Sequence, residues 1–446
     1  MLLFISFSAY YENLLEKNLL RWKDTCLVVF DEAHHCVKSH PYNRLLHFQH
    51  RECPVDERPK LLGLTASPAG KATVEQTVDM LKELMSNVGD AKIEIVEENQ
   101  DELDIYRSNA EIEIQTVSLN TTEKNLKQEL QVYILLCYMK MAELTDLLQH
   151  SDSEELKLSN KNDAEIQRFA EEKLDGTLLN YIQMTVDMSG PCSGYTDDQK
   201  ELAHNLKKHT QHMCVTLNIL LQFGMIAAID ELQELMNRDD KTNFEFARKV
   251  DLQCDTIQRY YDERLEGATS KYEGKFSQLI DLLTSKETLL LLGMEKSLVL
   301  ILVKERGSAF EIEEILRSQV DLRTAERGVS ALVGHGTTSG TDPGMKVSHQ
   351  KGVLDNIREH KYNIVVATSV AEEGIDIPEC ELVITLNPPS NVTALVQMRG
   401  RARKSKSKFI VVCNSTKEKE DLEDLLKRER NMMDAVKILA CQSMSL

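Results

Sequence analysis

The sequence lacks several features that would assign it to a simple class of protein. Its ten cysteines include no C-x-x-C pair, which argues against zinc sites of the usual spacing and against a short disulfide-stapled fold. No apolar run reaches the ~20 residues of a membrane-spanning helix. The apolar start at 1–9 has no basic residues before it, so a signal peptide is not expected. We therefore expect an intracellular protein with reduced cysteines.

Positive charge is also scarce, since the formal net charge is -19 at pH 7. A protein that coats nucleic acid needs a basic face, so that mode of binding is not expected. Basic residues do gather at 399–408, where they could form a local phosphate-binding groove or a solvated loop. Composition alone does not choose between the two.

The length of 446 residues, 42% of them hydrophobic, allows two or three domains with their own cores. Apolar stretches at 26–30 and 60–64 read as short buried strands of a parallel sheet, each ending in a polar signature. Between about 120 and 265, apolar residues recur at helical spacing, most clearly at 122–150 and 197–238. Strand patterns alternating with helical ones return later, at 297–303, 328–334, 363–369, 382–387 and 409–414.

These patterns predict an α/β protein with two parallel-sheet domains and an all-helical insert between them. We place a partial first sheet domain at 1–118, the helical insert at 119–265, the second sheet domain at 266–416 and a charged helical tail at 417–446.

Two adjacent carboxylates, Asp31 and Glu32, follow the first predicted strand. A nucleotide hydrolase uses such a pair, one carboxylate to hold Mg²⁺ and the other to orient the attacking water. Two acids after a strand are, however, more often a helix N-cap. The hydrolase interpretation gains weight from three further segments: Thr65-Ala66-Ser67, 367–378 and 397–403.

The order and spacing of these segments resemble helicase motifs II, III, V and VI. In such motors one sheet domain supplies the Mg²⁺ site and the other supplies arginines for charge on the γ-phosphate. More specifically, the chain resembles superfamily 2 RNA helicases of the Dicer and RIG-I-like kind. The resemblance lies in the helical insert, in DEAHHCVKSHPYN at 31–43, in TASP at 65–68, in ATSVAEEGIDIPEC at 367–380 and in RGRAR at 399–403. It implies two RecA-like motor domains, the first truncated at its N-terminus.

The resemblance also implies roles for individual residues. Asp31 would hold Mg²⁺, Glu32 would serve hydrolysis, and His34 would link the carboxylates to the second domain. The residues facing the nucleotide and its γ-phosphate would be Gly374, Asp376, Gln397, Arg401 and Arg403. Those facing RNA, or coupling the site to it, would be Thr65, Ser67, Lys304, Arg306, Thr368 and Ser369. Lys304 and Arg306 could equally be a strand-end pair that faces water.

The family implies ATP and Mg²⁺ as cofactors and double-stranded RNA as the partner, recognised by shape through phosphates and 2′-hydroxyls. It also implies a cytoplasmic monomer with no membrane contact. Dicer-like RNA processing and RNA sensing are not distinguished, because the sequence shows no accessory domain of either kind.

One essential part of a motor is missing. A Gly-rich phosphate loop with Lys and Ser/Thr normally precedes motif II, but only thirty residues precede Asp31 and none of them forms such a loop. The nearest mimic, AGKAT at 69–73, has Ala72 where Ser or Thr should bind Mg²⁺, and we reject it. ATP hydrolysis by this chain alone is therefore not expected. Three functions stay open: part of an ATP-dependent double-stranded-RNA helicase or translocase, a catalytically inactive RNA-binding or regulatory remnant, and a fork-type DNA helicase.

Overall fold

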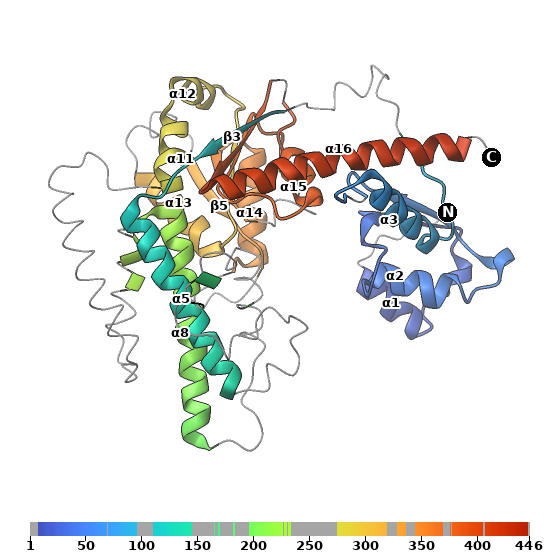
Figure 1. Ribbon diagram of the computed structural model, residues 1–446. Helices are drawn as coiled ribbons and strands as arrows, with labels where there is room; N and C mark the ends of the chain where they lie inside the picture. Colours follow the sequence, from blue (N-terminus) through green and yellow to red (C-terminus); the bar gives the residue numbers. More distant parts are fainter. Residues whose placement is uncertain are drawn as a thin grey trace. The chain divides into compact units, whose positions relative to one another are not determined.

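A computed structural model describes most of the two sheet regions and part of the helical one. The described residues are 8–68, 70–95, 110–144, 165, 168–169, 182, 196–225, 227–229, 231–232, 274–318, 328–335, 344–368, 375, 377–404 and 406–444 (Figure 1). They fall into two compact units. The first contains Met1–Ile114, Leu291–Val411 and Thr416–Leu446, and the second contains Gln115–Leu290 and Val412–Ser415.

The N-terminal part of the first unit contains a two-stranded parallel sheet with short helices around it. Leu27 pairs with Lys60 at one end of the sheet and Asp31 pairs with Leu64 at the other. The elements, in chain order, are α1 (Ser8–Glu16), η1 (Trp22–Asp24), β1 (Leu27–Asp31), η2 (Ala33–His35), α2 (Pro41–Leu45), η3 (Leu46–His50), η4 (Val55–Glu57), β2 (Lys60–Leu64) and α3 (Val74–Asn87). Both strands predicted in this region are thereby confirmed.

The two faces of this small sheet differ. Phe30 is buried on one face with Trp22, Leu45 and Leu46. The other face exposes large apolar side chains, each between 45% and 49% accessible: Leu27, Val29, Leu62 and Leu64. The prediction of buried strands was therefore wrong for one face, because the described helices that pack on the sheet do so on the Phe30 side.

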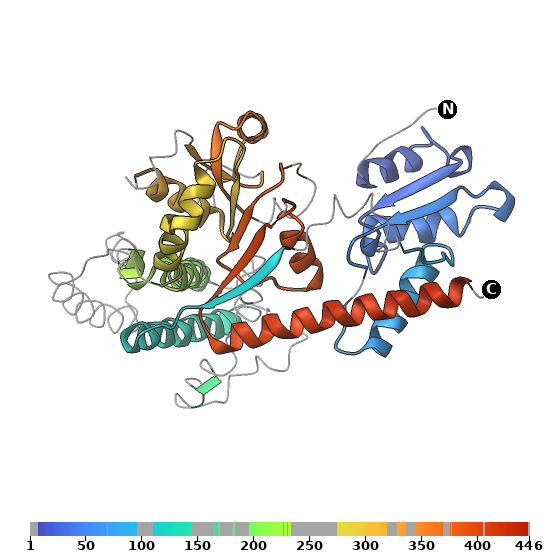
Figure 2. The ribbon, with the colours of Figure 1, turned by 90° about the horizontal axis from the view of Figure 1, so that it is seen from above.

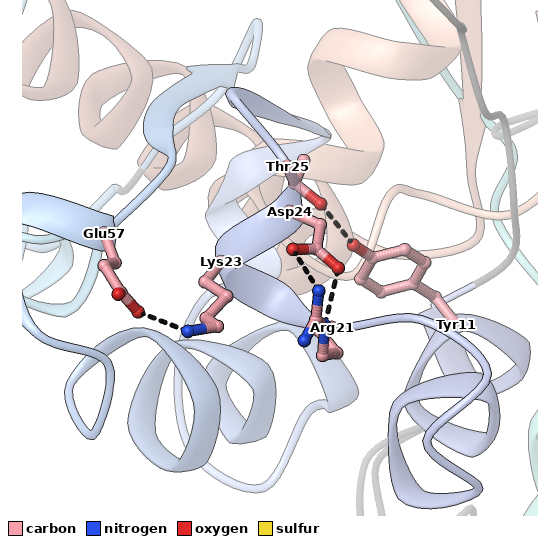
Figure 3. Close-up of polar contacts among 6 residues, drawn as sticks. All are labelled: Tyr11, Arg21, Lys23, Asp24, Thr25 and Glu57. Atoms are coloured by element: carbon pink, nitrogen blue, oxygen red, sulfur yellow. Dashed lines mark hydrogen bonds and ion pairs between the residues drawn. The ribbon is translucent and has the colours of Figure 1, made fainter.

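Polar contacts hold the turn that leads into β1 (Figure 3). The turn is the single 3₁₀ coil of η1, whose Trp22 is buried against the core. Side chains in η1 and at its two ends pair with one another, with η4 and with α1: Arg21 with Asp24 (2.7 Å), Lys23 with Glu57 (2.9 Å) and Thr25 with Tyr11 (3.2 Å). These contacts fix the direction from which β1 enters the sheet.

A six-stranded sheet forms the second sheet region, in the order β3-β8-β7-β4-β6-β5. Its strands are β3 (Glu111–Thr116), β4 (Val299–Leu302), β5 (Gly328–Leu332), β6 (Tyr362–Ala367), β7 (Leu382–Thr385) and β8 (Lys408–Cys413). Strand β4 lies between β6 and β7, pairs in parallel with both, and is buried along its whole length. All five strands predicted after residue 270 are present, while β3 was not predicted.

Helix α12 (Lys286–Leu292) precedes β4, and three helices connect strands of this sheet: α13 (Arg306–Ser318) joins β4 to β5, α14 (Val347–Arg358) joins β5 to β6 and α15 (Val392–Arg399) joins β7 to β8. Helices α13 and α14 pack on β5 and β6. A parallel sheet whose connections are helices is the α/β architecture expected from the sequence, and that fold class is confirmed.

The described part of the second unit includes the helices α5 (Thr121–Leu144), α8 (Asp197–Phe223) and α11 (Gly274–Thr284). Helices α5 and α8 lie side by side (Figure 1), and their shared core includes Leu130, Ile134, Leu217 and Leu220. The predicted helices at 122–150 and 197–238 are confirmed where they are described. The sequence also predicts a turn or loop at 186–196, around Ser189-Gly190-Pro191, and all of it except Thr196 lies outside the described residues.

The last element is α16 (Thr416–Met444), one continuous helix of 29 residues (Figure 2). Its C-terminal half packs on α3 through a small apolar cluster of Leu81, Ala435 and Leu439. Asn431 Nδ2 donates to the backbone carbonyls of Lys71 (3.3 Å) and Ala72 (2.8 Å). Among the helices that the structure describes, none is both long and apolar enough to cross a membrane.

Candidate nucleotide site

The two carboxylates of the DEAH segment stand at a sharp turn after β1. Asp31 is the last residue of the strand, and Glu32 adopts a left-handed backbone with φ 52° and ψ 52°. A non-glycine residue in this region costs roughly 1–2 kcal/mol. The Glu32 amide donates to Asp31 Oδ1 at 3.1 Å. The turn therefore presents both carboxyl groups at the carboxyl end of β1.

His34 joins this turn to the segment that follows β2. Its Nδ1 lies 3.0 Å from Thr65 Oγ1 and 3.3 Å from Glu32 Oε2. A proton on Nδ1 would be donated to Thr65 Oγ1, with Glu32 Oε2 as a close neighbour of the same nitrogen. The Ser67 amide also donates to Thr65 Oγ1, at 3.3 Å. The structure thus brings together four of the predicted site residues from two neighbouring strands.

Ser67 and Thr65 differ in their exposure. The Ser67 side chain is 1% accessible, whereas Thr65 is half-buried. Among the described residues, Ser67 Oγ has no hydrogen-bond partner. In the described conformation it is therefore Thr65, not the Ser67 hydroxyl, that meets solvent.

The residues present fit a magnesium ion that is shared with a nucleotide. Among the described residues, no group of three or more His, Cys, Asp or Glu side chains is placed to hold a metal by itself. Magnesium in nucleotide sites is commonly held by one or two carboxylates together with the phosphates. The exposed Asp31 carboxylate at the strand end matches that chemistry.

The second sheet places three predicted residues at the carboxyl ends of neighbouring strands. Lys304 follows β4 and is exposed, and its amide donates to Asn387 Oδ1 at 3.0 Å. Arg306 begins α13. Its guanidinium lies beside Gly334, since a methyl group added at that glycine would be 3.6 Å from Arg306 Nη2. Thr368 follows β6 and is 4% accessible. Three further predicted residues, Ser369, Gly374 and Asp376, lie outside the described part of the chain.

The three arginines of the RGRAR segment have different partners. Arg399, at the end of α15, forms an ion pair with Glu429 of α16. Arg401 Nη1 donates to the Ile375 carbonyl at 3.0 Å. Arg403 is exposed, and its Nε donates to the Gly400 carbonyl at 2.8 Å. Gln397 is half-buried on α15.

Sequence reasoning missed the partner of Arg399. Glu429 is thirty residues further along the chain, inside a long helix rich in charged residues. It also missed the aromatic contacts of His35, His40 and Tyr42 behind the DEAH turn. The density of aromatic and histidine residues at 34–42 was the available signal for the second group.

Comparison with known proteins defines the class of the second sheet region. Residues 274–406 match the family model described as helicase conserved C-terminal domain. The chain also resembles the solved Hef helicase domain of Pyrococcus furiosus, with a TM-score of 0.50 and 22% identity, covering 93% of this chain and 76% of that one. This second likeness concerns the fold, and it agrees with RecA-like sheet domains.

Curated relatives narrow the class further. Dicer-like protein 2 of Phaeosphaeria nodorum is 25% identical over 439 residues, which are 94% of this chain and 29% of that protein. The antiviral innate immune response receptor RIG-I of Homo sapiens is 25% identical over 430 residues, which are 92% of this chain and 43% of the receptor. The predicted resemblance to superfamily 2 helicases of the Dicer and RIG-I-like kind is therefore confirmed. The chain spans less than half the length of either relative.

Proposed function

We propose that this chain is part of an ATP-dependent helicase or translocase that acts on double-stranded RNA. The observation that carries the proposal is the cluster at the carboxyl end of β1 and β2, in which His34 Nδ1 forms a hydrogen bond with Thr65 Oγ1 and lies 3.3 Å from Glu32 Oε2. Open parallel sheets bind ligands outside the carboxyl ends of their strands. The resemblance to Dicer-like proteins and RIG-I supports the choice of RNA.

Each residue of the DEAH turn would have a distinct task in hydrolysis. Asp31 would hold Mg²⁺ together with the phosphates, and the ion would neutralise charge that develops on them. Glu32 would accept a proton from the attacking water, and its contact with His34 Nδ1 would hold its carboxylate in place. Arg401 and Arg403 would stabilise charge on the γ-phosphate, with Gln397, Gly374 and Asp376 lining the same site.

RNA would be held through its backbone. The candidate contacts are the members of the predicted set that are exposed or half-buried, Thr65, Lys304 and Arg306, together with Ser369, whereas Ser67 and Thr368 are buried in the described conformation. Because the net charge is -19, binding would depend on few local phosphate contacts rather than on a basic surface. His34 would carry the effect of RNA at Thr65 to the Glu32 carboxylate, since it contacts both Thr65 and Glu32.

We propose further that the working motor includes a Gly-rich phosphate loop on additional sequence. The exposed apolar face of the first sheet supports the presence of such sequence, because additional strands or helices would cover its side chains: Leu27, Val29, Leu62 and Leu64. The greater length of the relatives agrees with it. We place the protein in the cytoplasm as a monomer, on the basis of the family alone.

The test begins with the transcript, from which a longer reading frame is cloned and its product purified. ATP hydrolysis is then measured with and without double-stranded RNA, in the parent and in Glu32→Gln. We expect RNA to stimulate hydrolysis, and Glu32→Gln to lower the rate by about 100-fold or more while ATP still binds, because a general base contributes on that scale. Glu83→Gln, at an exposed carboxylate on α3, is the matched control and should leave the rate unchanged.

Three results would contradict the proposal. Hydrolysis that RNA fails to stimulate would remove RNA as the partner. A preference for branched DNA over double-stranded RNA would favour the fork-type DNA helicase. A reading frame without a phosphate loop, giving a protein that binds RNA but not ATP, would favour the inactive regulatory remnant.

A further inference from the structure

Behind the DEAH turn, a continuous series of aromatic rings connects the sheet core with His34. Three of the four neighbouring pairs lie in the usual range for aromatic contacts, and the pair of His34 with His35 is slightly closer. The ring centroids are separated by 5.0 Å from Phe30 to Tyr42, 4.8 Å from Tyr42 to His40, 4.8 Å from His40 to His35 and 4.2 Å from His35 to His34. The His40 and His35 rings are stacked, with an interplanar angle of 14°.

The inner end of the series is anchored in the core. Phe30 is 3% accessible and packs with the other buried residues of the first sheet. His40 is the N-cap of α2, where its Nδ1 accepts from the Tyr42 amide at 3.2 Å and Pro41 takes the first helical position. Asn43 Nδ2 also donates to the Lys38 carbonyl at 2.7 Å. These hydrogen bonds therefore hold the segment before α2 in one conformation.

The outer end of the series bears on the candidate site. His34 must keep one ring orientation if its Nδ1 is to contact both Thr65 Oγ1 and Glu32 Oε2. It sits in the 3₁₀ turn that follows the left-handed Glu32. Strained backbone of this kind persists only where the surrounding structure holds it. His35, which contacts His34 on one side and His40 on the other, provides such a hold.

We propose that His35 and His40 are positioning residues for His34. Their stacked rings hold the His34 imidazole in the orientation that links Glu32 with Thr65. The inference deepens the proposed function and rests on it in one respect: the orientation of Glu32 matters for turnover only if this carboxylate activates water. The alternative is that His40 serves α2 only as an N-cap and that the stacked rings have no effect on His34.

Substitutions can separate the ring from the cap. His40→Asn keeps a side-chain oxygen that can cap α2 but removes the ring. His35→Asn removes the second ring, whereas His35→Phe restores an aromatic surface without ring nitrogens. The matched control is His47→Asn, since His47 is exposed and contacts Phe48 in a pair separate from the series.

The measurement is ¹⁵N NMR of the full chain with labelled histidine, in which the His34 ring signals are assigned from a His34→Gln sample. We expect one hydrogen-bonded ring form with Nδ1 protonated in the parent, in His35→Phe and in His47→Asn. In His35→Asn and His40→Asn the two ring nitrogen shifts should move toward each other as the ring exchanges between tautomers. Urea midpoints are recorded for every variant, to show that each one folds.

Two outcomes would overturn the inference. One is that His35→Asn and His40→Asn leave the His34 ring shifts unchanged. The other is that His35→Phe perturbs His34 as strongly as His35→Asn, since the aromatic surface of residue 35 would then not be what positions His34.

Activity is a separate readout. In a longer protein that carries the phosphate loop, His40→Asn should lower kcat about tenfold, with the KM for ATP unchanged. Absence of hydrolysis in the parent would count against the proposed function, while the NMR result would still decide the positioning role.

Discussion

Arg399 and Glu429 form a bidentate ion pair between the end of α15 and the middle of α16. Nη1 donates to Oε2 at 3.0 Å and Nη2 donates to Oε1. The side chains are 27% and 15% accessible, so the pair is largely shielded from water. Because Arg399 opens the RGRAR segment, the pair fixes how residues 400–403 leave the helix.

We predict that Glu429→Gln lowers the free energy of unfolding by about 1–3 kcal/mol. The substitution keeps the shape of the side chain but leaves the Arg399 guanidinium without its carboxylate, and hydrogen bonds to charged groups are worth about that much. Urea unfolding of the full chain measures the effect.

The control for this prediction is Asp424→Asn on the same helix. Asp424 pairs with Arg428, but both side chains are at least 40% accessible. Exposed pairs contribute about 0.2–1 kcal/mol, so the midpoint should move little. Equal losses of unfolding free energy in the two variants would show that the Arg399–Glu429 pair stabilises the protein no more than an exposed pair does.

A second prediction compares two glycines. A methyl group at Gly63 of β2 would lie 2.8 Å from the Ala33 side chain of the DEAH turn, whereas at Gly352 of α14 it would meet nothing within 4 Å. Gly63→Ala should therefore destabilise the protein by about 1–3 kcal/mol through overpacking. Gly352→Ala should stabilise it by about 0.4–1 kcal/mol, because alanine has less freedom to lose when the helix forms.

Thermal unfolding of both glycine variants beside the parent distinguishes these effects. Shifts of opposite sign are expected. A Gly63→Ala protein as stable as the parent would mean that the DEAH turn yields easily, which would contradict a turn held rigidly against β2.

The sheet strands could be read from the sequence largely because they are apolar. Strands β4 and β7 are buried along their whole length, and a continuous apolar run between helical patterns is typical of such strands. Strand β3 was missed because Glu111 and Glu113 alternate with Ile112 and Ile114, so that no apolar run marks it. The alternation itself was a usable signal for a half-buried strand.

The candidate site was predictable only where it follows strand ends. Asp31 ends β1, Glu32 follows it and Thr65 follows β2, so a parallel sheet brings them to one edge. The contacts of Glu429 with Arg399 and of Asn431 with Lys71 join residues far apart in sequence. An isolated charged or amide residue in a polar helix belongs to no recognisable sequence pattern, so its distant partner could not be predicted.

A third prediction concerns pH. Burial lowers the pKa of His50 below its ordinary value of about 6.5, and the charge of Arg58 acts in the same direction. The Trp22 indole donates to His50 Nδ1 at 3.3 Å, which requires that nitrogen to be unprotonated. Near this pH the unfolded chain therefore binds more protons than the folded one, so stability falls as the pH drops below about 6.5.

The measurement is urea unfolding between about pH 7.5 and 5.5, followed by fluorescence of Trp22, the single tryptophan. His50→Gln keeps an acceptor for the indole but does not titrate, so its unfolding free energy should change less with pH than that of the parent. Identical pH dependence in the two proteins would assign the effect to other groups.

The last prediction concerns thiol reactivity around the RGRAR segment. Cys26 and Cys441 are exposed, whereas Cys380 is fully buried and its amide donates to the Arg401 carbonyl at 3.1 Å. Burial raises the pKa of the Cys380 thiol to about 12, although the nearby Arg401 and Arg403 charges oppose the shift. Since the thiolate is the reactive form, alkylation at about pH 8 followed by peptide mapping should label Cys26 and Cys441 before Cys380, which should react only in urea. Rapid labelling of Cys380 without denaturant would mean that the segment around Arg401 opens in the native protein, in which case its contact with Ile375 would not hold the arginine in one place.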